Sequence, residues 1–169
     1  KAGMSGIKTF FFQKFNTADF TITAGVVDDI GTAELYRFET VTGLGSIVET
    51  LVTTEETGIA YLEQLLSMTL QHLVVEDLPE MDALKLGRWI VYALDYANNT
   101  RVYGINNGCG SSGGDSVSGE APGDAKTLTM TFLGREENYA PFTAPPLAPS
   151  SPYNPFEDMI GATITPPYI

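Results

Sequence analysis

Few residues of this sequence could act as nucleophiles, bases or metal ligands. Its single histidine, His72, lies beside Leu70 and Leu73 in an apolar stretch, and no Gly-x-Ser-x-Gly motif accompanies it. Its single cysteine, Cys109, stands between two glycines, with no base or cation beside it to form a thiolate. One cysteine also excludes an internal disulfide and a cysteine-built zinc site. We therefore predict no nucleophilic catalysis.

Adjacent acids are the other chemical candidates, because two carboxylates can cleave a glycosidic bond or bind calcium. The pairs are Asp28–Asp29, Glu55–Glu56, Glu136–Glu137 and Glu157–Asp158. Neighbouring residues of a strand point to opposite faces, so each pair supplies only one carboxylate to a given site. The sequence also lacks the spaced acids of a calcium loop. We predict no catalytic, metal or cofactor-binding residues, and no enzyme.

Charge is the strongest compositional signal. The chain of 169 residues has a net charge of −12 and a pI near 4.2. Residues 28–82 hold twelve acids and a single base, Arg37. Such a surface does not bind a phosphate backbone, which requires lysine and arginine, although it can let nucleic acid pass without sticking.

The length and hydropathy predict one domain without a membrane span. A single core commonly holds 100–200 residues. No run reaches the roughly 18 apolar residues of a spanning helix, and the first residues lack the features of a signal peptide. We expect a domain over residues 1–138 and an extended arm over 139–169.

Short runs rich in Thr, Val, Ile and aromatic residues predict a mainly β domain. In residues 126–134, Leu and Phe alternate with Thr, which is typical of a strand with one buried face. The turn at residues 96–99 predicts a hairpin. The expected strands are 10–15, 20–27, 35–40, 46–54, 89–95, 100–105 and 126–134.

One short helix is predicted over residues 79–86. Asp77 can cap it, Pro79 suits its first turn and Gly87 suits its end. Residues 60–75 fit a helical stripe and an alternating strand equally well, so their pattern leaves both alternatives open.

Two segments depart from the strand pattern. Residues 106–124 are mostly Gly, Ser and Asp, and they predict a flexible loop.

Residues 139–169 hold eight of the ten prolines together with spaced apolar residues, which favours an extended arm lying on a surface. That surface is either the arm's own domain or a neighbouring subunit, and we favour the neighbour. We expect that deleting the arm leaves a folded monomer that assembles poorly. The candidate inter-subunit anchors are Phe142, Tyr153, Phe156 and Tyr168.

The order of these features resembles the tail-tube (major tail protein) family of tailed bacteriophages. The resemblance rests on residues 57–73, 88–104 and 123–142, which hold the TG turn and the run after it, the hairpin WIVYALDYANNTRVYG and the strand TLTMTFLG. It implies a β-sandwich or barrel-like fold with one flanking helix, and a strand over 60–73. It also implies a virion structural protein, made in the bacterial cytoplasm, whose rings, usually hexameric, stack into a tube through which DNA passes.

In that interpretation the partners are further copies of the chain and other tail or neck proteins, with no cofactor. The lumen-facing candidates are Glu49, Glu55, Glu56 and Glu63. Two alternatives remain open. One is a related phage role, as a head–tail connector or neck ring or as a capsid-associated protein. The other is a carbohydrate- or surface-binding module with a stacking platform made by Trp89, Tyr92, Tyr96 and Tyr103, although alternation places Trp89 opposite Tyr92 and Tyr96.

Overall fold

The computed structural model describes residues 4–16, 20–71 and 75–166, and in them the chain is mainly β with one short α-helix. The helical elements are a 3-10 turn, Val75–Asp77, and α1, Leu78–Leu84. The strands are β1 Ile7–Lys14, β2 Thr21–Thr23, β3 Val26–Asp29, β4 Ala33–Glu39, β5 Ser46–Thr54, β6 Ile59–Gln71, β7 Trp89–Asp95, β8 Thr100–Tyr103, β9 Cys109–Val117, β10 Thr127–Glu136, β11 Phe142–Thr143 and β12 Ala162–Thr165.

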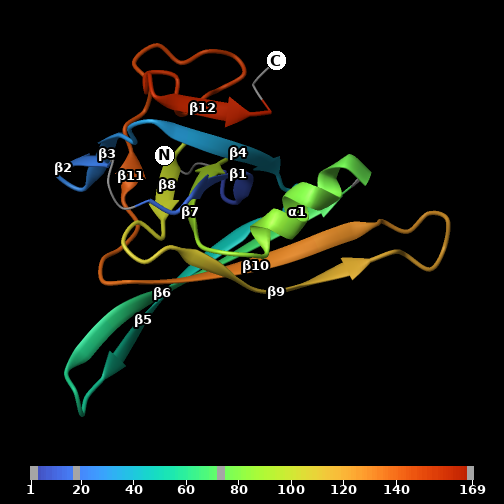
Figure 1. Cartoon of the computed structure of the whole chain (residues 1–169), viewed down its shortest axis with the longest axis horizontal. Coiled ribbons are helices and arrows are strands. Elements are labelled where there is room, and N and C mark those ends of the chain that lie inside the picture. Colours follow the sequence, from blue (N-terminus) through green and yellow to red (C-terminus); the bar gives the residue numbers. More distant parts are fainter. Residues whose placement is uncertain (1–3, 17–19, 72–74, 167–169) are drawn as a thin grey trace.

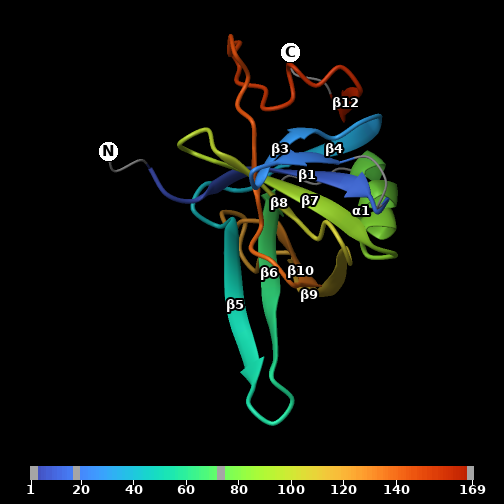
Figure 2. The same cartoon turned by 90° about the vertical axis from the view of Figure 1, so that its left-hand side faces the viewer.

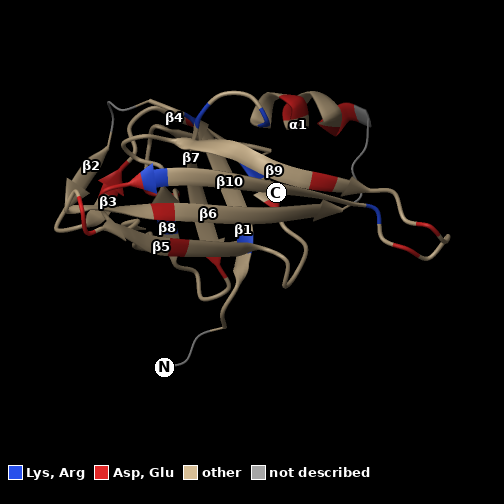
Figure 3. Ribbon diagram, turned by 90° about the horizontal axis from the view of Figure 1, so that it is seen from below, with Lys and Arg blue, Asp and Glu red and all other residues tan. Residues whose placement is uncertain are grey.

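The strands form a mixed sheet that folds into two layers and does not close into a barrel (Figures 1 and 2). The first layer consists of the long antiparallel strands β5, β6, β10 and β9, in that order (Figure 3). The second consists of β4, β1, β7 and β8. The layers are joined where Trp89 of β7 pairs with Cys109 of β9.

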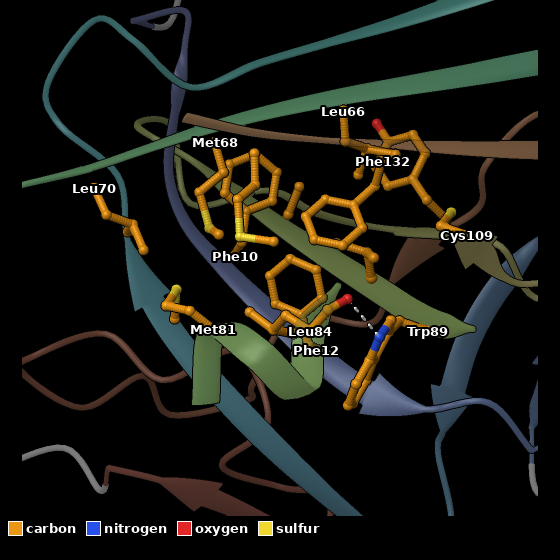
Figure 4. Close-up of a cluster of buried hydrophobic side chains, with 14 of the residues drawn as sticks. Phe10, Phe12, Leu66, Met68, Leu70, Met81, Leu84, Trp89, Cys109 and Phe132 are labelled. Atoms are coloured by element: carbon orange, nitrogen blue, oxygen red, sulfur yellow. Dashed lines mark hydrogen bonds between the residues drawn. The ribbon is translucent and has the colours of Figure 1, made fainter. Parts of the chain in front are cut away.

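The main core lies between the two layers. Leu66 and Met68 of β6 and Phe132 of β10 meet Phe12 of β1, while Trp89 closes one end (Figure 4). The rings of Phe12 and Phe132 are tilted, with their centroids 4.9 Å apart. Met81 and Leu84 of α1 cover the same cluster, which explains why this short helix is held against the sheet.

The second layer is buried on both faces. Phe10 and Phe12 of β1 point into the main core, whereas Phe11 points into a second cluster on the far side. In the same way, Trp89 and Val91 of β7 face one cluster and Tyr92 faces the other. Strands buried on both sides have nearly continuous apolar runs, which accounts for the FFF and WIVYAL segments.

The C-terminal arm covers that second cluster, so it is part of the domain. β12 pairs in parallel with β4, and the side chains of Phe156 and Met159 are buried in the cluster. The Phe156 ring lies edge-on to the rings of Phe11 and Tyr92, with both centroid distances 5.1 Å. Phe156, Met159 and β12 therefore pack on the arm's own domain, whereas a further contact of the arm with a neighbouring subunit stays a prediction.

Most of the predicted elements are confirmed. Strands 46–54 and 89–95 have the predicted bounds, and residues 60–71 are a strand, as the family resemblance implied. The helix is confirmed but ends at Leu84 rather than 86. There the Trp89 indole N–H donates to the Leu84 carbonyl at 3.1 Å, and Gly87 turns the chain with φ +85°.

Two predictions about the chain path are wrong. Residues 20–27 are not one strand, because Ala24 and Gly25 have φ of +53° and +80° and form the turn between β2 and β3. Residues 106–124 are not one loop, because Cys109–Val117 is strand β9. Its small side chains bury little surface, and the backbone hydrogen bonds to β10 hold the strand instead.

No helix within the described residues is long and apolar enough to cross a membrane.

Candidate assembly surface

The candidate functional surface is the outward face of the four-stranded layer β5–β6–β10–β9. Along β6, the even-numbered residues such as Leu66 face the core, and the odd-numbered residues such as Glu63 and Leu65 face outward. Cross-strand partners share a face, so the registers identify the rest of the surface. Hydroxyl and apolar side chains share it. The hydroxyl residues are Ser46, Thr50, Thr54, Ser67, Thr69, Thr127, Thr129 and Thr131, and the apolar ones are Val48, Val52, Ile59, Tyr61, Leu65, Val117 and Leu133.

Charged groups are few on this face. In these four strands it carries Glu63, Asp115 and Arg135 (Figure 3). The Arg135 Nε donates to Glu63 Oε1 at 3.1 Å, so the single basic group of the face is already paired. A polyanion would meet hydroxyl, apolar and carboxylate groups on these four strands, without an unpaired cation to bind its phosphates.

Both lateral edges of this layer are unpaired within the part of the chain that the structure describes. β5 is bonded to β6 alone, and beyond Cys109 β9 is bonded to β10 alone. The three strand pairs of the layer are all antiparallel, so β5 and β9 also run in opposite directions. An edge with free N–H and C=O groups is a template for pairing with another chain.

The hairpin of β5 and β6 projects beyond the body (Figures 1 and 2). Its tip is the turn of residues 55–58, where the Gly58 N–H donates to the Thr54 carbonyl at 2.8 Å. Leu51 and Ile59 near the tip are 56% and 57% exposed. The two residues lie on opposite faces of the hairpin, because Leu51 pairs with Leu62 of the core-facing set and Ile59 belongs to the outward-facing set.

The four predicted lumen acids lie in three different environments. Glu63 lies on the outward face, and Glu55 and Glu56 lie in the exposed turn of the hairpin. Glu49 is corrected: it lies on the opposite face, and its side chain is only 9% exposed. Its carboxylate accepts hydrogen bonds from Arg101, Gln64 and the Ala140 N–H. Glu49 therefore has a structural role.

The four predicted anchors of the arm also differ in their exposure and contacts. Phe142 is 49% exposed, and the Arg101 guanidinium lies 5.2 Å from its ring centre. Tyr153 is partly buried, with the Lys8 ammonium 5.9 Å from its ring centre. Phe156 is 2% exposed within its own chain, so it does not present a surface to a neighbour. Tyr168 lies outside the described residues.

The other chemical candidates are used in folding or lie outside the described residues. Cys109 is fully buried, and this burial raises the pKa of its thiol to about 12. The buried Glu136 carboxylate accepts the backbone N–H groups of Asn106 and Asn107. His72 lies outside the described residues. Across the described ranges, no group of three His, Cys, Asp or Glu side chains is placed to hold a metal ion.

The carbohydrate platform is corrected as well. Trp89, Tyr92 and Tyr103 are 7%, 0% and 3% exposed, so their rings cannot stack on a sugar. Trp89 and Tyr92 belong to opposite clusters, as alternation predicted.

Sequence reasoning missed the outward face of this layer and its second edge. The alternating threonines of residues 127–131 were visible, but the partner strand β9 has no apolar residue between 110 and 116 that could have marked it.

Comparison of the chain with protein-family models, with curated proteins and with solved structures gave no match to any of them.

Proposed function

We propose that this chain is a structural subunit of a phage tail tube, which assembles into rings through the β5 and β9 edges and encloses a channel for DNA. The observation that carries the proposal is the four-stranded layer with two open edges and an outward face of hydroxyl and apolar side chains that carries few charges. The family resemblance of the sequence points in the same direction.

Edge pairing between copies is geometrically consistent. Because β5 and β9 run antiparallel, β5 of one copy can add to β9 of the next and continue the antiparallel order around a ring. The contact is heterologous, with different surfaces on the two partners, and such contacts give rings when the rotation between copies closes. Closure would leave no free edge in the four-stranded layer.

Strand number sets a lower limit on the ring. Two copies would give about eight strands, whose interior is filled by side chains, whereas about 16 strands leave an aqueous channel. At least four copies are therefore needed, and a six-fold ring satisfies the condition. The projecting hairpin would reach the adjacent ring of a stack.

The lining that we propose differs from a strongly acidic one. Hydroxyl and apolar side chains, Asp115 and the paired Glu63 would face the DNA, and the other acids would lie elsewhere. Such a surface offers weak, exchangeable contacts, which suits passage rather than binding.

The test is to block one edge. Lysines on an edge strand oppose pairing, so we expect the double variant Val48→Lys/Val52→Lys on β5 to remain monomeric in sedimentation velocity under conditions where the unmodified protein forms rings. Leu147→Lys is the matched control, because Leu147 is 96% exposed on the arm. Unchanged rings in the β5 variant would refute assembly through this edge.

A further inference from the structure

The two open edges of the β5–β6–β10–β9 layer are offset along the strand direction. The registers across the layer place Ser46, the first residue of β5, in one row with Gly113 of β9. From this row β5 continues toward the hairpin tip as far as Thr54, whereas β9 extends in the opposite direction to Val117. The β5–β6 turn and the β9–β10 loop accordingly lie at opposite ends of the layer (Figure 1). Two copies placed side by side must therefore slide along their strands before the edges match.

The extent of strand pairing limits this slide. Without a slide, only residues 46–48 of β5 would face the open part of β9, because Cys109 already pairs with Trp89. A slide of four or six residues toward the β9–β10 loop lets residues 46–52 or residues 48–54, respectively, face residues 110–117. The extra β9 residue beside Gly113 forms a bulge, as it does opposite β10. An odd slide is excluded, because it would bring outward-facing side chains beside core-facing ones.

Closure of the ring sets the same limit independently. Each copy adds four strands about 4.8 Å apart, and each residue of slide adds about 3.3 Å along the strand. A slide of four residues per copy then tilts the strands by about 35° from the ring axis, and a slide of six by about 45°. Closed barrels have tilts of about 35–45°, whereas slides of two or eight residues would give about 20° or 55°. Two registers remain.

Side-chain chemistry distinguishes these two registers. A slide of six residues places Val48 opposite Val117, two apolar side chains that are 53% and 52% exposed in the single chain. It also places Thr50 opposite Asp115, where the hydroxyl can donate to the carboxylate. A slide of four residues would instead place Val48 opposite Asp115, and Ser46 opposite Val117. Apolar pairs and hydrogen-bonded pairs stabilise neighbouring strands, so the slide of six residues is favoured.

We propose that β5 of each copy pairs with β9 of the next with a stagger of six residues, so that Val48 faces Val117 and Thr50 faces Asp115. This inference rests on the proposed tube function and specifies the contact between its subunits. In the ring the Asp115 carboxylate would accept a hydrogen bond at every contact between copies.

Disulfide cross-linking measures this register directly. Val117→Cys chains are mixed with Val48→Cys chains under assembly conditions and oxidised briefly, while the native Cys109 is buried. Ser46→Cys and Thr50→Cys are the matched controls, each two residues away on the same face. Facing residues have Cα atoms about 4.5–5.5 Å apart, within disulfide range, and a shift of two residues adds about 6.6 Å along the strand. We expect Val48→Cys to link at least tenfold faster than either control.

Single lysines on β5 provide an independent measurement. In the proposed register Thr50→Lys places an ammonium opposite the Asp115 carboxylate, whereas Val48→Lys places one opposite Val117. Both variants add the same charge to the same edge, so their comparison isolates the facing residue. We expect the concentration needed for ring formation, measured by sedimentation velocity, to be at least tenfold higher for Val48→Lys than for Thr50→Lys. Equal values or the reverse order would contradict the register.

The outcomes separate this inference from the proposed function. Rings that form normally, while Ser46→Cys or Thr50→Cys links to Val117→Cys as fast as Val48→Cys does, would overturn the register and leave the tube proposal standing. Rings without a cross-link between any of these variants would overturn the contact of β5 with β9 together with its register. Absence of any self-association by the unmodified protein would overturn both proposals.

Discussion

Glu49 shows how an acid of a strongly acidic chain can stabilise the fold. Its nearly buried carboxylate joins β5 to Gln64 of β6, Arg101 of β8 and the Ala140 backbone. The sequence alone could not distinguish the buried Glu49 from the exposed Glu55 and Glu56. The burial of Glu49 depends on Arg101 and Ala140, which are 52 and 91 residues away in the chain.

Replacing the partner of Glu49 should therefore cost stability. We expect Arg101→Met to lower the free energy of unfolding by about 1.5–3 kcal/mol, because it removes a hydrogen bond to a charged and nearly buried group. Lys85→Met is the control. It removes an ion pair whose side chains are 56% and 68% exposed, so its effect should stay below about 1 kcal/mol. Urea unfolding measures both, and equal effects would contradict a structural role for Glu49.

Phe156 anchors the arm within its own domain. Phe156→Ala should lower the free energy of unfolding by about 3–5 kcal/mol, because it empties the space between Phe11 and Tyr92. Ile160→Ala, at a fully exposed site of the same arm, should change it by less than about 0.5 kcal/mol. A small effect of Phe156→Ala in thermal or urea unfolding would return the arm to a neighbour-binding role.

Buried thiol and phenol groups predict a loss of stability in alkali. Burial raises the pKa of Cys109 from 9.0 to about 12 and that of Tyr103 from 10.0 to about 12. Above pH 9 the unfolded chain therefore binds fewer protons than the folded chain, so stability falls as the pH rises from 9 toward 12. Urea midpoints at pH 8, 9.5 and 10.5 should decrease, less steeply in Cys109→Ala. A flat profile would contradict the burial of these groups.

At the scale of elements, the secondary structure was predicted correctly where the pattern of side chains identifies the element. Strands 46–54 and 89–95 and the helix near 79 follow from apolar spacing, Pro79 and Gly87. The prediction was wrong where backbone hydrogen bonds alone hold the element. β9 is paired with β10, although its sequence CGSSGGDSV is typical of a loop. That strand is one of the four strands of the candidate surface, and it forms one of the two edges.

Glycine at position 114 is a requirement of the β9–β10 pairing. Its φ is +153°, and a Cβ there would lie 2.1 Å from the Thr129 carbonyl oxygen. We expect Gly114→Ala to destabilise the protein by about 1–3 kcal/mol and to reduce amide protection in β10. Gly123→Ala is the control, because a Cβ at Gly123 meets nothing within 4 Å. Hydrogen exchange distinguishes the variants, and equal protection would indicate that β9 is not firmly paired.

At the scale of the whole molecule, one layer provides the stability of the fold and the other provides the candidate assembly surface. The β4–β1–β7–β8 layer is buried on both faces and provides stability, so the β5–β6–β10–β9 layer can leave one face and two edges open. Sequence reasoning predicted the β-rich architecture from periodicity. It could not predict that the arm completes the fold, because Phe156 meets Phe11 across 145 positions of the chain.

Electron microscopy of the purified, concentrated protein in negative stain tests the central claim most directly. We predict uniform rings or hollow tubes without added ligand, with at least four subunits around an open channel. A field of monomers at every concentration, or closed dimers without a channel, would contradict assembly through the β5 and β9 edges.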